Sequence, residues 1–191
     1  IVAKAYIKNE TPDYYLTHYR SNHYQWDKDF QKTIRFYVGG EVAYPTKWIK
    51  PRLNVSFENI TQYIYFAEDG MPQQMDGSIQ VLAADLELNL TTPWVNLDNR
   101  IIYQHASSPN LPLPAITMYN NLYYHGTWVK ALDVQIGVDM RFFTKYYAPV
   151  LNPALGQFCV QSKEQVGNYP VMNVYANFYV KHIRLKLFAQ Y

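Results

Sequence analysis

The sequence predicts an all-β fold, a transmembrane antiparallel up-and-down β-barrel with about ten strands in this chain. Three observations predict it: apolar and polar residues alternate, the expected strands are long, and short connections alternate with long ones along the chain. The composition agrees, because 19 Tyr bring the aromatic share to 17% while charged residues also make up only 17%. Aromatic side chains favour the pleated surface of a strand. We expect one domain, residues 1–191.

The alternation is clearest in residues 82–90 and 132–142. In both stretches the even positions are apolar, while the odd positions carry most of the polar and charged residues. A helix with 3.6 residues per turn would spread both sets around its circumference, so the period of two predicts strands. In a barrel the apolar set faces lipid. The expected lipid-facing residues are Leu82, Leu86, Leu88, Leu132, Val134, Ile136, Val138 and Met140.

The same template fits residues 34–42, 52–58, 95–104, 116–125 and 172–187, with Asn99 and Ile102 as exceptions. The parity changes across Lys181-His182, which predicts a tight turn there. A strand at residues 1–8 and a weaker one near residues 14–21 complete the set. The polar faces of these strands are expected to line the lumen. The expected pore-lining residues are Arg35, Glu41, Arg52, Glu58, Asp85, Glu87, Asp98, Arg100, Asp133, Gln135, Asp139, Arg141, Lys181, Arg184 and Lys186.

The connections between these strands alternate in length. Short ones are expected near residues 8–13, 44–50, 91–94, 125–128 and 181–182, and long ones at 22–30, 67–77, 106–113 and 144–169. Short turns on one rim and long loops on the other are typical of outer-membrane barrels. Tyr146, Tyr147 and Phe158 predict that the longest loop is ordered, either as a constriction inside the lumen or as a cover over its mouth.

A large soluble β-sandwich is the main alternative, because it also has one apolar and one polar face. Strand length favours the barrel, since strands of about 12 to 15 residues exceed the five or six of ordinary sheets. Aromatic residues near the strand ends are expected to form two interfacial girdles. In a sandwich the same residues would be core-edge aromatics. They are Tyr44, Trp48, Trp94, Tyr124 and Trp128 at the short-turn rim, and Tyr63, Tyr65, Phe66, Tyr103, Phe142 and Phe143 at the long-loop rim.

Sites for catalysis, metals or cofactors are not predicted. The five histidines are dispersed, and the single cysteine, Cys159, is expected to be a small apolar side chain. Acidic neighbours such as Asp85 and Glu87 are interpreted as lumen charges rather than as an acid and a base. Gly39-Gly40 lies inside a strand pattern and indicates a kink or close packing. Scattered basic residues argue against a nucleic-acid partner. No apolar window is long enough for a transmembrane helix.

Four stretches of sequence carry a family resemblance. They are residues 19–26 (YRSNHYQW), 103–114 (YQHASSPNLPLP) with 119–124, 139–149 (DMRFFTKYYAP) with 152–158, and 166–170 (VGNYP). Together they resemble the putative porins of the Bacteroidota, near the C-terminal part of that family's barrel. The resemblance spans residues 5–191 and implies a barrel in the outer membrane of a Gram-negative bacterium. It also implies that this chain is a segment of a longer protein and a larger barrel, although the ending Leu187-x-Ala189-x-Tyr191 resembles a terminal barrel strand.

The function expected from this resemblance is passive diffusion of small solutes through a porin-like channel, without enzymatic activity. The alternatives are a structural or scaffolding barrel in a larger envelope complex and, more remotely, a barrel enzyme such as a lipase or protease. Lipid of the outer membrane is the expected partner, with a homo-oligomer or other envelope proteins left open. The expected lumen charges have mixed signs, which predicts weak ion selectivity.

Overall fold

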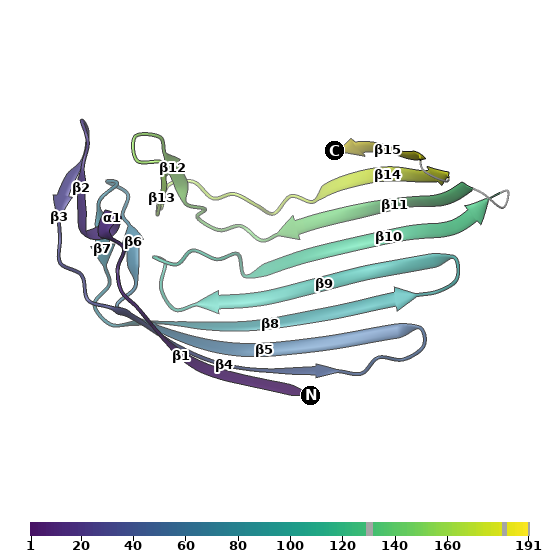
Figure 1. Ribbon diagram of the computed structural model, residues 1–191, viewed down its shortest axis with the longest axis horizontal. Coiled ribbons are helices and arrows are strands. Elements are labelled where there is room, and N and C mark those ends of the chain that lie inside the picture. Colours follow the sequence, from purple (N-terminus) through teal and green to yellow (C-terminus); the bar gives the residue numbers. More distant parts are fainter. Residues whose placement is uncertain (129–131, 181–182, 191) are drawn as a thin grey trace.

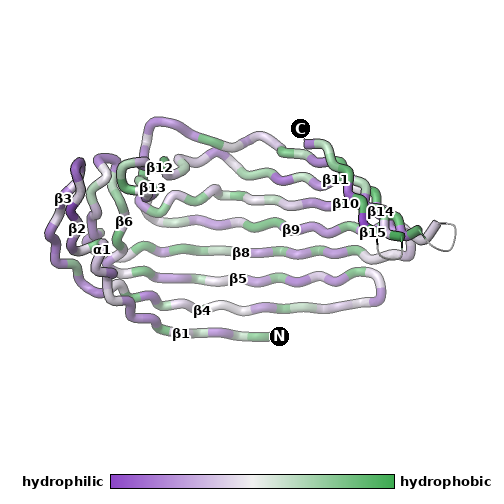
Figure 2. Tube along the Cα trace, turned by 45° about the horizontal axis from the view of Figure 1, so that its top comes forward, coloured by the Kyte–Doolittle hydropathy of each residue, from purple (hydrophilic) through white to green (hydrophobic). Residues whose placement is uncertain are grey.

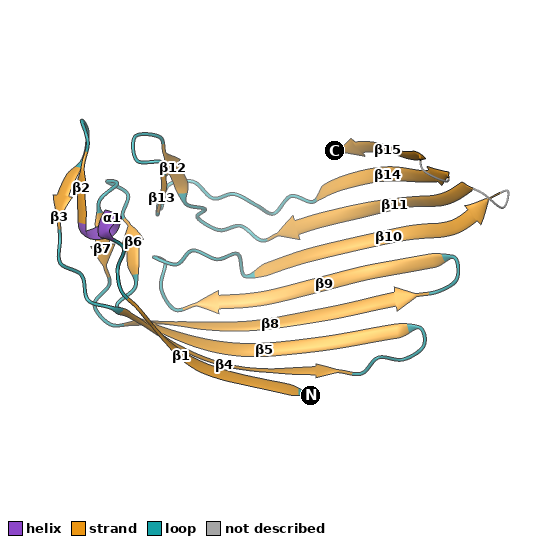
Figure 3. Cartoon of the chain, viewed as in Figure 1, coloured by secondary structure: helices purple, strands orange, loops and turns teal. Residues whose placement is uncertain are grey.

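A computed structural model of the chain describes residues 1–128, 132–180 and 183–190. Its main body is one antiparallel sheet of nine strands (Figures 1 and 3). Neighbouring strands in the sheet follow one another along the chain. The all-β prediction is therefore confirmed. The sheet is open, with the first and last of these strands as its edges. The strands are β1 (Val2–Glu10), β4 (Thr33–Ala43), β5 (Ile49–Thr61), β8 (Ser78–Thr91), β9 (Val95–Ala106), β10 (Ile116–Trp128), β11 (Leu132–Phe143), β14 (Val171–Val180) and β15 (Ile183–Gln190).

The segment between β1 and β4 corrects the sequence prediction. The expected strand near residues 14–21 is instead a single helical turn, α1 (Tyr14–Thr17), followed by β2 (His18–Arg20), which pairs with β3 (Gln25–Asp27) outside the main sheet. Its aromatic residues pack on one another rather than on sheet neighbours, with the ring centroids of Tyr19 and Trp26 4.5 Å apart. The short connection expected near residues 8–13 is thus the start of a long one, and the sheet has nine strands.

Short and long connections alternate as predicted elsewhere. Residues 44–48 and 92–94 make short turns at one end of the sheet, and residues 62–77, 107–115 and 144–170 make long loops at the other (Figure 1). Two of the long loops contain small hairpins, which are β6 (Ile64–Phe66) with β7 (Pro72–Gln74), and β12 (Val150–Asn152) with β13 (Gln157–Cys159). Residues 125–128, expected as a turn, extend β10. The tight turn expected at Lys181-His182 lies outside the described residues.

The register gives the sheet two chemically different faces, visible as alternating hydropathy along each strand (Figure 2). On one face Leu86 lies between Leu53 and Ile101 of the neighbouring strands. On the other face Glu87 lies between Arg52 and Arg100. The same parity holds across all nine strands because each pairing is in register. None of the helices among the described residues is long and apolar enough to cross a membrane.

Buried apolar side chains are few, and all except Val134 lie in or under the long loops. Among the described residues they are Trp26, Ile60, Ile79, Val134, Leu155 and Cys159. Trp26, Leu155 and Cys159 belong to the loops themselves. Ile60 and Ile79 are paired residues at the long-loop ends of β5 and β8, and they lie on the polar face of the sheet. The loops therefore cover that end of the polar face.

The three long segments 11–32, 62–77 and 144–170 are held together as a loop cap. Asn152 Nδ2 donates to Tyr24 Oη at 2.8 Å, and the Val160 backbone N–H donates to the Phe66 carbonyl at 2.9 Å. The prediction that residues 144–169 are ordered at the long-loop rim is confirmed. The basis given for it was wrong in part, because the Phe158 side chain is 64% exposed and Leu155 and Cys159 supply the buried contacts.

Candidate functional site on the polar face of the sheet

The described residues that were predicted to line a lumen all lie on one face of the sheet. The register places on it Arg35, Glu41, Arg52, Glu58, Asp85, Glu87, Asp98, Arg100, Asp133, Gln135, Asp139, Arg141, Arg184 and Lys186. Lys181 lies outside the described residues. The prediction thus identified a shared face, and the contacts within it divide into two halves of different chemistry.

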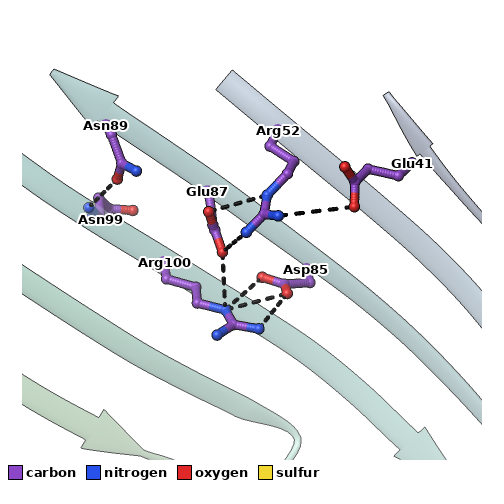
Figure 4. Close-up of polar contacts among 7 residues, drawn as sticks. All are labelled: Glu41, Arg52, Asp85, Glu87, Asn89, Asn99 and Arg100. Carbon is purple, nitrogen blue, oxygen red and sulfur yellow. Dashed lines mark hydrogen bonds and ion pairs between the residues drawn. The ribbon is translucent and has the colours of Figure 1, made fainter. Parts of the chain in front are cut away.

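The half formed by β4, β5, β8 and β9 carries a network of ion pairs (Figure 4). Arg52 Nε donates to Glu87 Oε2 at 3.1 Å, and a second nitrogen of Arg52 lies 3.9 Å from Glu41 Oε2. Arg100 contacts both oxygens of Asp85, at 3.0 Å from Nε and 2.6 Å from Nη2, and lies 3.6 Å from Glu87. Two-pronged contacts of this kind fix the guanidinium groups in place. We call these five residues the charge clamp.

A second ion-paired group lies nearer the long-loop end. Arg35 donates from Nε to Glu10 at 3.2 Å and from Nη1 to Glu58 at 3.1 Å. Its side chain and those of its two partners are about one-third exposed or less. Opposite charges so close together cancel most of their field at distances beyond about 8 Å in physiological salt. The polar face in this half is consequently hydrophilic without carrying a strong potential of one sign.

The half formed by β10, β11 and β14 is held mainly by amides and tyrosines. Asn177 Nδ2 donates to Gln135 Oε1 at 3.1 Å, and Gln135 Nε2 donates to Tyr175 Oη at 3.4 Å. Tyr175 Oη in turn donates to Asn121 Oδ1 at 2.9 Å, and Asn121 Nδ2 contacts Asp98 at 3.5 Å. Each hydrogen bond leads to the donor of the next one, from Asn177 of β14 to Asp98 of β9. We call these five residues the amide chain.

Sequence reasoning missed Tyr175, Asn121 and Asn177 as members of the site. Their parity was available, since each falls on the polar side of an alternating segment. The connection between them was not, because it needs the register of strands whose residues are 42 to 54 positions apart. A groove of about 400 Å³ opens over this half of the face. It is lined by β10, β11, β14 and β15, which indicates that the sheet curves toward its polar face there.

The opposite face is apolar and largely uncovered. Leu82, Leu86, Leu88, Ile136 and Val138, which were expected to face lipid, are 37–46% exposed, a high value for aliphatic side chains. Leu132 and Met140 are half-buried. Val134 is a correction, since its side chain is 0% exposed and contributes nothing to the outer surface. It is flanked in register by Gly126 and Phe178, and the Tyr124 ring lies over Gly126.

The predicted exception Asn99 on this apolar face has a partner. Its side-chain amide donates to Asn120, which shares the same face on the neighbouring strand. Two amides that form a hydrogen bond with each other are tolerated on an apolar face far better than one amide without a hydrogen-bond partner.

The aromatic residues expected at the two rims differ, because those at the short-turn rim are exposed and several of those at the long-loop rim belong to the loop cap. At the short-turn rim Tyr44, Trp48, Trp94 and Trp128 are 42–74% exposed. At the long-loop rim the expectation fails for Tyr63, Tyr65 and Phe66, because that segment belongs to the loop cap, where Phe66 packs 6.1 Å from Trp26. Phe143 lies on the polar face, in register with Thr117.

Family comparison covers the entire chain. The model of the family described as "Putative porin" matches residues 1–191. The chain belongs to this putative porin family. The resemblance to the putative porins is thereby confirmed. No curated protein and no solved structure matches the chain.

In this porin-family chain the polar face carries ion-paired and hydrogen-bonded side chains. The described residues contain no group of three or more His, Cys, Asp or Glu side chains arranged to hold a metal ion. Burial raises the pKa of the Cys159 thiol, so it is protonated and weakly nucleophilic at neutral pH. Ion-paired and hydrogen-bonded side chains spread over a long curved face can hold water and exchange weak contacts with a passing solute.

Proposed function

We propose that this chain forms part of the wall of an outer-membrane β-barrel pore for passive diffusion of small solutes in a Gram-negative bacterium. The observation that carries the proposal is a single sheet with one ion-paired polar face and one exposed apolar face. The apolar face would contact lipid and the polar face would contact water. Membership of the putative porin family supports the same function.

The exposed apolar surface fits lipid better than water. Soluble proteins rarely expose a continuous apolar patch larger than a few hundred Å². Here exposed aliphatic residues follow one another in register across neighbouring strands, as in Val42, Leu53 and Leu86. Strands β5, β8 and β10 have 13 or 14 residues. At about 3.3 Å per residue and a tilt near 45° they would rise about 30 Å, the thickness of a hydrocarbon layer.

Closure of the pore requires strands beyond the open edges of this sheet. We propose that further strands of a longer chain supply them, since β1 and β15 present free edges that a membrane does not tolerate. The origin in the Bacteroidota, the lipid contacts and any homo-oligomer or envelope partner belong to the same proposal. The absence of enzymatic activity is also part of this proposal, because the polar side chains of the face form ion pairs and hydrogen bonds with one another.

Conductance of the full-length protein in planar bilayers tests this function. We expect ohmic steps with weak ion selectivity, because Arg35, Arg52 and Arg100 are each paired with carboxylates within 4 Å. The reversal potential in a salt gradient measures the selectivity. A strong preference for one sign of ion would contradict the balanced wall. A protein that inserts correctly but does not conduct would refute the pore and favour a scaffolding barrel.

A further inference from the structure

We propose that the groove over β10, β11, β14 and β15 is a binding subsite for a neutral carbohydrate, with the ring of Tyr175 as its stacking surface. The inference rests on the proposed pore and names the class of solute that its wall would recognise. The groove has a volume of about 400 Å³ and lies on the polar face. Its lining combines aromatic rings with amides, whereas β4 to β9 carry the charge clamp.

The position of the Tyr175 ring follows from the glycine beside it. Gly137 of β11 lies opposite Tyr175 of β14, and a Cβ atom on Gly137 would be 2.7 Å from both Cζ and Oη of that tyrosine. The ring and the Cβ atom of Tyr123, which is also 2.7 Å away, together occupy the space that a side chain at position 137 would take. The Tyr175 ring covers the backbone of β11 with one face and lines the groove with the rest of its surface.

The amide chain holds this ring in place before any solute arrives. Tyr175 Oη accepts from Gln135 and donates to Asn121, so the hydroxyl is fixed from two strands. Side chains that are already ordered lose little entropy on binding. Asn121, Gln135 and Asn177 each use one amide N–H in the chain and keep the other, together with carbonyl lone pairs, for a ligand in the groove.

This combination matches the surface of a sugar. A pyranose ring has an apolar C–H face, which packs against an aromatic ring, and a rim of hydroxyls that both donate and accept hydrogen bonds. Three charged groups line the groove. Asp139 accepts from Asn173 at 2.8 Å, Arg141 lies over the Tyr119 ring at 5.8 Å, and Lys186 of β15 brings a single ammonium group, which can donate to a sugar hydroxyl. A neutral polyhydroxylated solute therefore fits the groove better than an ion.

Current block by maltotriose tests the subsite in the reconstituted full-length protein. We expect the sugar to reduce conductance in a saturable way, and Tyr175→Ala to raise the half-blocking concentration about tenfold. Gly137→Ala should weaken the block at least as much, because the added methyl group meets both the Tyr175 ring and the Cβ atom of Tyr123. Tyr175→Phe keeps the ring and should retain most of the block.

Matched controls come from β4, where Tyr37 lies over Gly39 of its own strand. Tyr37→Ala and Gly39→Ala should leave the block by maltotriose unchanged. Conductance that maltotriose does not block, or blocks equally in all variants, overturns the subsite and leaves the pore intact. Block by glutamate or lysine in place of maltotriose also overturns it.

A protein that does not conduct fails as a pore, and the subsite is then tested by equilibrium dialysis of labelled maltotriose with the detergent-solubilised protein. Saturable binding that is weakened by Tyr175→Ala and Gly137→Ala but not by the two controls supports the subsite. An absence of binding, or equal binding by all variants, overturns it.

Discussion

Three tyrosine–glycine contacts shape the surface of this sheet residue by residue. The rings of Tyr37, Tyr124 and Tyr175 each occupy the space above a glycine, two residues away on the same strand or on the neighbouring one. A kink or close packing was predicted at Gly39-Gly40, and close packing is found at Gly39. The other two contacts were not predicted, because a glycine in the sequence does not reveal which ring will cover it. Small residues next to tyrosines let long side chains lie against the backbone without a gap.

Neighbouring residues of β5 test which face meets lipid. Val55 is 45% exposed on the apolar face, and Ser56 lies on the polar face at the same height. We expect Val55→Arg to reduce the free energy of unfolding by about 2 to 4 kcal/mol, the cost of a basic side chain at the bilayer midplane. Ser56→Arg should cost much less, because its guanidinium reaches water.

The measurement is urea unfolding of the full-length protein from lipid vesicles. Equal destabilisation by the two variants, or a larger one for Ser56→Arg, would contradict the assigned faces.

At the scale of elements, the strands of the sheet were predictable and the loop cap was not. Alternation in the sequence was enough to predict β8 and β11, because a strand with one apolar and one polar face has a period of two residues. The strand expected at residues 14–21 is not formed in the main sheet, because Tyr15 packs on Trp26 and Phe66 in the loop cap. Packing between loops that are far apart in sequence leaves no periodic signal. The cap had to be found from contacts such as Asn152 with Tyr24.

Removal of the β12–β13 hairpin tests the role of the cap. Its ends are close, because Gln161 Nε2 donates to the carbonyls of both Ala148 and Glu164. Residues 150–163 can therefore be replaced by a short Gly-Ser linker. We expect a larger single-channel conductance, since the hairpin packs against the β6–β7 loop at the mouth of the proposed pore. Phe158→Ala, at an exposed position of the same hairpin, is the control and should leave conductance unchanged. If the deletion also leaves it unchanged, the hairpin is no constriction.

At the scale of the whole molecule, apolar side chains are exposed over one face of the sheet. Among the described residues, the buried apolar side chains other than Val134 lie in or under the loops at one end. The sequence predicted the charged members of the polar face, because parity assigns them individually. It could not predict that they divide into a charge clamp and an amide chain, since that division depends on which strands pair and in what register.

Site-directed labelling along β8 and β11 tests the two faces most directly. In a Cys159→Ser background, single cysteines replace Leu82, Ala83, Leu88 and Asn89 in β8, and Gln135, Ile136 and Val138 in β11. The protein in lipid vesicles is then exposed to a water-soluble thiol reagent and, separately, spin-labelled for collision with oxygen dissolved in the lipid. We predict that positions 83, 89 and 135 react from water while positions 82, 88, 136 and 138 collide with oxygen, with a period of two. Uniform labelling of both sets, or the reverse assignment, would contradict a sheet with one face to lipid and the other to water.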